Sequence, residues 1–173
     1  MKLSASVLAA VALAASSSAC SLAGCDKPDS GSCGNACCSL TISIPMTTTE
    51  VMNSLNATIT AGGPDGLYTP MMTAEGTLTF GDLKQFGAPV DFIGQAEHQT
   101  INGQYTDTVN FTLEPSADGK STTVNAFSIS QIAGAFGDDG QNHWNIAQLF
   151  DEDSKFAGVA TIANKDSSCT GSK

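Results

Sequence analysis

The densest group of candidate ligand-binding side chains is the run Asp138-Asp139-Gly140-Gln141-Asn142. Two carboxylates and an amide are hard oxygen donors of the kind that calcium prefers. An EF-hand loop needs a bidentate glutamate at position 12, but Leu149 stands there when Asp138 is position 1. We therefore expect a tight turn in place of a metal site, with Gly140 at positive φ and Asn142 capping a following helix.

Nucleophilic catalysis would need a serine close to a histidine and an aspartate. Ser128 and Ser130 stand inside an expected strand, and no Gly-x-Ser-x-Gly elbow surrounds either of them. The two histidines of the chain are His98, expected to be solvated at a polar strand edge, and His143, expected to pack on the apolar face of a helix. We predict no catalytic residue, no metal ligand and no cofactor.

Ligand binding is the function that the remaining side chains favour. The candidate binding residues are Ser128, Ser130, Asp138, Asp139 and Asn142. Thioethers adapt to irregular shapes, so methionines could line an apolar cavity between a helix and a sheet, or could simply fill gaps in the core. The methionines in question are Met46, Met52, Met71 and Met72.

The charge balance excludes one large class of partner. The chain of 173 residues has a formal net charge of −10, with 17 acidic residues against 7 basic ones, all of them lysines. Nucleic-acid binding requires many basic groups to neutralise phosphates, so we expect no nucleic-acid partner. The absence of arginine also excludes a bidentate guanidinium clamp for phosphate or carboxylate groups.

The first residues are typical of an export signal. Lys2 precedes an apolar run over residues 3–15, which is shorter than the roughly 20 residues of a membrane-spanning helix. Small residues favour cleavage after Ala19, which makes residues 1–19 a signal peptide. Alternatively, residues 22–25 resemble a lipobox; residues 1–24 would then be a lipoprotein signal, with Cys25 lipid-anchored at the cell envelope. We expect a secreted protein without a transmembrane span in the mature chain.

Six cysteines support an oxidising compartment. They are Cys20, Cys25, Cys33, Cys37, Cys38 and Cys169. Five crowd the N-terminal end, so we expect at least one of them to bond Cys169 and join the two ends of the chain. Zinc binding would need a second pair of ligands that the sequence does not offer.

Two Asn-x-Ser/Thr triplets are candidate glycosylation sites. They begin at Asn56 and Asn110. Their use would require a eukaryotic secretory pathway, and the sequence does not reveal the source.

Residues 47–60 are the clearest predicted helix. Thr47 and Glu50 form a capping box, and Val51, Met52, Leu55 and Ile59 follow at helical spacing. A strand is expected before the helix at 40–44, and a long connection with one strand at most is expected after it, over 61–89.

From Val90 onward, the alternation of apolar and polar residues predicts antiparallel strands. Expected strands cover 90–93, 97–101, 105–113, 122–130 and 156–163, and a second helix covers 142–150. Asn102-Gly103 predicts a two-residue type I′ hairpin. In the strand 105–113, Asp107 shares one face with Val109, Phe111 and Leu113.

These elements predict an α+β fold. We expect an antiparallel sheet of three to five strands with helices packed on one face. A disulfide-stapled, cysteine-rich segment over 20–40 would precede a single domain over 41–169 and a short tail over 170–173.

Three segments of the second half resemble a known family. They are 105–111, the Ser-x-Ser strand 127–132 and the Asp-x-Gly-x-Asn run 138–142, followed by Ile146. Over about residues 90–150 this pattern is similar to domain-of-unknown-function family 1499. The resemblance implies an α+β plan with an upstream helix. The family pattern places arginines where Phe127, Gln131 and Asn145 stand, so an anion-binding role is not carried over.

The sequence therefore predicts a secreted, disulfide-stabilised, non-catalytic module that binds a small, apolar ligand or a cell-surface component. The alternatives are a structural protein of the cell surface or matrix, and a hydrolase that uses paired carboxylates.

Overall fold

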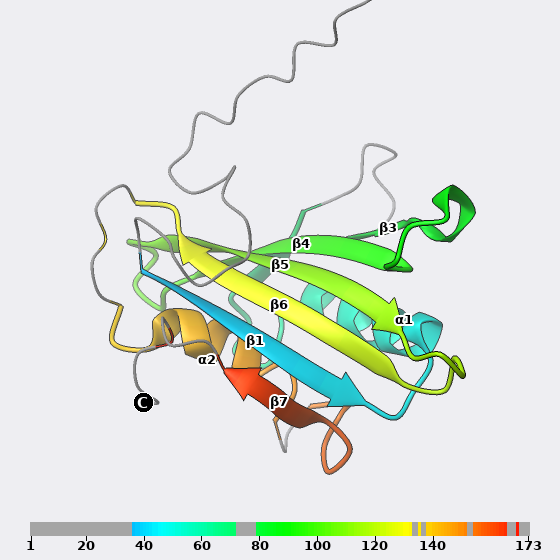
Figure 1. Cartoon of the computed structure of the whole chain (residues 1–173). Coiled ribbons are helices and arrows are strands. Elements are labelled where there is room, and N and C mark those ends of the chain that lie inside the picture. Colours follow the sequence, from blue (N-terminus) through cyan, green and yellow to red (C-terminus); the bar gives the residue numbers. More distant parts are fainter. Residues whose placement is uncertain are drawn as a thin grey trace, which may run out of the picture.

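The computed structural model describes residues 36–71, 79–132, 135, 138–151, 154–165 and 169 (Figure 1). The predicted export signal, the lipobox alternative, Met72, the C-terminal tail and the cysteines at positions 20, 25 and 33 lie outside these residues.

Seven strands form one antiparallel sheet. The strands are β1 (Cys37–Ile44), β2 (Tyr68–Pro70), β3 (Phe80–Asp82), β4 (Phe92–Gln99), β5 (Thr106–Pro115), β6 (Thr122–Ser130) and β7 (Thr161–Lys165). Their order in space is β2-β4-β5-β6-β1-β7, and β3 also pairs with β4. The helices are α1 (Thr48–Thr60) and α2 (Gln141–Ala147), with a short 3-10 turn at Lys84–Phe86.

The sheet is larger than the three to five strands that we expected. The additional short strands β2 and β3 both lie in the stretch 61–89, for which one strand at most was predicted. Each has only three residues, too few to show an alternating pattern, and each is held by pairing with the edge of β4. Non-local pairing, which a single sequence does not reveal, therefore decides these strands.

Alternation along the long strands builds the core. On β5, Asp107, Val109, Phe111 and Leu113 are buried, while the intervening residues are half-buried on the other face. The same buried cluster contains Val51, Leu55 and Ile59 of α1 and Ile146 of α2. Figure 1 shows β1, β5 and β6 side by side, with α1 crossing behind them.

Helix α1 forms where the sequence predicts it. Thr47 is the N-cap, and it forms the predicted capping box with Glu50. Two hydrogen bonds make the box: the Glu50 carboxylate accepts from the Thr47 backbone N–H at 2.9 Å, and the Thr47 hydroxyl accepts from the Glu50 N–H at 3.3 Å. Because both groups are local, this start signal does not depend on tertiary structure.

The predicted two-residue hairpin at Asn102-Gly103 is wrong in detail. Gly103 has a φ of 66°, but Asn102 is not among the residues at positive φ, which a type I′ turn would require. The loop is longer: the Gly103 N–H donates to the Thr100 carbonyl, and the Thr100 N–H donates to the Tyr105 carbonyl. The β5–β6 connection repeats this pattern between Ser116 and Ser121.

A disulfide joins Cys38 to Cys169 across 131 residues of sequence. It confirms the expected link between the cysteine-rich end and Cys169. Cys37 is disulfide-bonded as well. In the part of the chain that the structure describes, no helix is long and apolar enough to cross a membrane.

Candidate functional site

Four buried polar side chains form a row across one end of the sheet. The strand register places Tyr68 opposite His98, His98 opposite Asp107, and Asp107 opposite Ser130. Their exposed fractions are 4%, 1%, 3% and 7%. Farther along β4 and β5, the corresponding inward positions are apolar, for example Ala96 and Val109. The core therefore ends at this polar row.

A cavity of about 900 Å³ lies against the row. Its walls come from the loop before β2, from β4, β5 and the turn between them, from the end of β6 and the connection that follows it, and from the start of α2. Its lining residues are Asp65, Leu67, His98, Thr100, Ile101, Asn102, Tyr105, Asp107, Ser130, Ile132, Ala135, Asp138, Asp139, Gln141 and Trp144. This volume is in the range of small-molecule binding sites.

His98 is held by a carboxylate. Its Nε2 lies 2.9 Å from Oδ2 of Asp65, whose side chain is 29% exposed. Burial raises the pKa of Asp65, but hydrogen bonds from His98, the Leu67 N–H and Gln148, together with the charge of His98, lower it overall. An ionised carboxylate only accepts hydrogen bonds, so Nε2 carries the proton of this pair.

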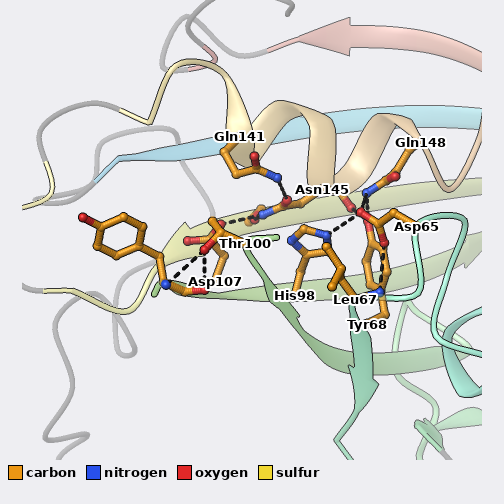
Figure 2. Close-up of polar contacts among 11 residues, drawn as sticks. Asp65, Leu67, Tyr68, His98, Thr100, Asp107, Gln141, Asn145 and Gln148 are labelled. Carbon is orange, nitrogen blue, oxygen red and sulfur yellow. Dashed lines mark hydrogen bonds and ion pairs between the residues drawn. The ribbon is translucent and has the colours of Figure 1, made fainter. Parts of the chain in front are cut away.

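The second ring nitrogen of His98 is the unusual atom of the site. Nδ1 is buried and has no hydrogen-bond partner among the described residues. Figure 2 shows it turned away from Asp65, toward the side on which Asp107 lies. When the ring is neutral, Nδ1 is an acceptor without a donor, a state that costs free energy in a buried environment.

Asp107 is the second buried titratable group of the row. Burial raises its pKa, while hydrogen bonds from Asn145 and Ser130 and the charge of His98 oppose the rise. The nearby charge of Asp138 adds to it. Asn145 Nδ2 donates to Oδ2 of Asp107 at 2.8 Å. The carboxyl group is therefore easier to protonate than an ordinary aspartate.

Asn142 joins three of the sequence-predicted binding residues in one network. Its Nδ2 lies 3.1 Å from Ser130 Oγ and 2.7 Å from Asp138 Oδ2, and its Oδ1 accepts from Ser128 Oγ at 2.7 Å. Asn142 and Ser128 are fully buried. These two residues connect α2 to the sheet and do not line the cavity, whereas Ser130, Asp138 and Asp139 do.

The predicted cap of the second helix is wrong. Gly140, at a φ of 83°, is the N-cap of α2, and Asn142 lies within the helix. The Asp138 carboxylate satisfies the first N–H groups of the helix instead: it accepts from the backbone N–H groups of Gly140 and Asn142 at 3.1 and 2.6 Å. The positive φ of Gly140 was predicted correctly.

A second set of hydrogen bonds links the row to α2 and to the segment after it (Figure 2). Gln148 Nε2 donates to Asp65 Oδ2 at 3.1 Å and to the Tyr68 hydroxyl at 2.8 Å. The Tyr68 hydroxyl donates to the Asn145 carbonyl. These contacts lock the carboxylate that orients His98.

Apolar and aromatic side chains surround the cavity where it meets the surface. Trp144 is 41% exposed, Tyr105 51%, Ile101 93% and Ile132 42%. Large side chains at such exposure, next to a buried polar end, give the cavity an amphipathic character.

The expectation that His98 is solvated is wrong. His98 is buried, because β2 pairs with the edge of β4 at this position, an edge that looked polar in sequence. His143 is half-buried, and the buried residues of α2 are Asn142, Asn145 and Ile146. The apolar cavity lined by methionines is also not found among the described residues: Met52 lies in the core, Met46 packs against it, and Met71 is 38% exposed.

Four residues of the site were missed by sequence reasoning as binding residues: Asp65, His98, Asp107 and Asn145. One of them carried a signal, because Asp107 alternates in phase with the core residues of β5. A charged residue at an inward position needs a partner or a function. Asp65 lies in an irregular loop where no pattern applies.

The two glycosylation candidates lie in different settings. Asn56, on α1, accepts from the Thr79 N–H at 3.1 Å, and Asn110, on β5, accepts from Gln95 at 2.6 Å. Both asparagines are half-buried, and their glycosylation stays a prediction.

No family model, curated protein or solved structure matches this chain. The resemblance to family 1499 stays a prediction. Among the described residues, no group of three or more histidine, cysteine or acidic side chains is arranged to hold a metal ion.

Proposed function

We propose that this chain is a secreted, non-catalytic binding module whose cavity holds a small molecule with one polar end. The observation that carries the proposal is the cavity of about 900 Å³ that ends on the unpartnered Nδ1 of His98. A ligand that donated a hydrogen bond there would satisfy an atom that the described protein groups leave unpaired. The apolar body of the ligand would contact Trp144 and Ile132.

This proposal changes the chemistry of the ligand expected from sequence. A purely apolar ligand would leave the polar row without partners, so an amphipathic ligand fits better. We also propose that both helices cover one face of the sheet, because α1, α2 and the strands contribute side chains to the same core cluster. Secretion is supported by the disulfides, which persist in oxidising compartments.

Tryptophan fluorescence offers a direct test, because Trp144 is the only tryptophan of the chain and lines the cavity. Native mass spectrometry of protein from its own source should show a mass above that of the polypeptide, which is lost on gentle activation. Addition of the released compound to ligand-free protein should then change Trp144 fluorescence in a saturable way. A bare polypeptide mass, with no change in fluorescence across a panel of small amphipathic compounds, would contradict the proposal and favour the structural role.

Proton-transfer catalysis is the second candidate function, and the Asp65–His98 pair is the observation that favours it. A carboxylate at Nε2 leaves Nδ1 as a base, and Asp107 beside it is an acid that burial keeps protonated more readily. The probe 5-nitrobenzisoxazole tests this: the base removes the C3 proton, the N–O bond breaks, and a nitrile and a phenolate form. Rate enhancement that His98→Gln abolishes would support catalysis. A rate no greater than that of free imidazole would contradict catalysis and leave ligand binding as the function.

A further inference from the structure

The cavity has a strongly one-sided charge. Among the described residues, four carboxylate side chains line it, from Asp65, Asp107, Asp138 and Asp139, and no lysine does. In the part of the chain that the structure describes, His98 is the only basic side chain within salt-bridge distance of a carboxylate, that of Asp65, and this contact is an ion pair only when the ring is protonated. Asp107 and Asp139 have no ion pair to a basic side chain among the described residues, within a chain whose net charge is −10.

The carboxyl groups act on one another. The charge of Asp138 contributes to the raised pKa of Asp107, which means that the two groups lie near enough to repel. Asp138 also accepts the helix-capping bonds described above, so it is fixed at the cavity wall. A positive charge placed between these groups would relieve the repulsion, while an anion would add to it.

The unpartnered Nδ1 of His98, at the inner end of the cavity, lacks a hydrogen-bond donor among the described residues. When the His98 ring is neutral, with its proton on the Nε2 that faces Asp65, Nδ1 accepts a hydrogen bond. His98 is 1% exposed, so a donor must reach it from the cavity that its ring lines. An ammonium group carries several N–H donors and no acceptor, and it can serve Nδ1 and the Asp107 carboxylate together.

Two aromatic rings lie at the outer part of the cavity. Trp144 and Tyr105 are both partly exposed lining residues. Aromatic faces attract organic cations, and tryptophan does so most strongly. Together with the carboxylates, these rings are the side chains that recognise organic ammonium groups, whereas inorganic cations would need a cluster of oxygen ligands that is not found in the described residues.

We propose that the ligand of this cavity is an organic amine that binds as its cation, with the ammonium group between Asp107 and His98 and its apolar body against Trp144 and Tyr105. The inference rests on the proposed binding function and names its ligand class. The negative charge of the whole chain assists by raising the local concentration of cations.

Three matched probes test the charge preference: 2-phenylethylamine, 2-phenylethanol and 3-phenylpropionate. They share a phenyl group on a short chain and differ in the charge at the end. None absorbs at 295 nm, so each can be titrated against Trp144 fluorescence in the disulfide-intact protein. We expect the amine to bind at least about tenfold more tightly than the alcohol, and the carboxylate to cause no change.

Variants identify the groups responsible. Asp107→Asn and Asp139→Asn should each weaken binding of the amine several-fold more than they weaken binding of the alcohol. Asp139 is exposed and has a φ of 50°, a conformation that asparagine tolerates, so this variant keeps the fold. Asp118→Asn in the exposed β5–β6 turn removes the same charge far from the cavity and should bind the amine as the wild type does.

The outcomes separate this inference from the function on which it rests. Equal affinity for the amine and the alcohol, or preference for the carboxylate, would overturn the cation while leaving a binding module. No response to any of the three probes at millimolar concentration would also overturn it. The binding function itself is decided by the copurified mass and its saturable rebinding, independently of these probes.

Discussion

His98 on β4 and Asp107 on β5 are paired residues in the sheet register, and both side chains are buried at the inner end of the cavity. One is oriented by a carboxylate, and the other is a carboxyl group whose pKa is raised by burial. Titratable groups whose environments move their protonation equilibria are enriched at functional sites. Several properties of the protein should depend on this pair and on the contacts that position it.

The stability of the protein should depend on pH through Asp107. Its folded-state pKa is raised above the ordinary value of 3.8, so its stabilising contribution is complete below that value and is lost as pH rises through the folded pKa. Asp107→Asn removes this titration and keeps an oxygen that accepts from Asn145. The free energy of unfolding of the variant minus that of the wild type should therefore increase between pH 3 and pH 7.

Urea unfolding at pH 3, 5 and 7 measures this difference. The groups that face Asp107 are His98, Ser130, Asn145 and Asp138; all are kept in the variant, so their own titrations largely cancel in the comparison. A constant difference across the three pH values would contradict the raised pKa.

Removal of the Asn145 side chain should destabilise the fold. It is fully buried, donates to Asp107 and Ser128, and accepts from Gln141 at 2.7 Å. Asn145→Ala removes a hydrogen bond from each of these groups, two of them buried, which should cost about 2–3 kcal/mol in the free energy of unfolding. Asn53→Ala, on the exposed face of α1, should stay within about 0.5 kcal/mol of the wild type. Similar losses in both variants would argue against the buried network.

Gly94 on β4 provides a test of core packing. A Cβ atom at this position would lie 2.4 Å from the ring of Phe80, which is 1% exposed and cannot move into solvent. Gly94→Ala should therefore cost about 1–3 kcal/mol through overpacking. Gly81→Ala on β3 is the matched control, because its Cβ would meet only Ile93 at an ordinary 3.7 Å. Thermal unfolding of both variants checks the difference, and equal melting temperatures would show that Phe80 can shift at little cost.

The disulfide between Cys38 and Cys169 should contribute strongly to stability. It closes a loop across 131 residues, for which the chain-entropy model suggests roughly 4–5 kcal/mol. The double variant Cys38→Ala with Cys169→Ala should lose most of this amount in guanidinium unfolding, and the slope of the transition should rise because the unfolded chain becomes less compact. A loss below about 1 kcal/mol would mean that β1 and the C-terminal segment are held by packing alone.

Local and periodic features could be predicted from the sequence alone. The capping box of Thr47 and Glu50 involves residues three apart, and the inward direction of Asp107 follows from a side-chain period of two along β5. The expected bond from Cys169 to an early cysteine followed from their uneven distribution. These features need only neighbouring residues, or a count, and the structure contains all of them.

The site depended on tertiary structure. Asp65 reaches His98 across 33 positions, and Asn145 reaches Asp107 across 38. Alternation tells which face of a strand a residue occupies, but it does not tell which residue of another strand lies opposite. That choice is made by the register of β4, β5 and β6 and by the covering of their ends by β2 and α2. Burial of His98, its pairing with Asp65 and the cavity that both residues line are therefore properties of the assembled sheet and helices. Each arises from segments that meet only when the chain has folded.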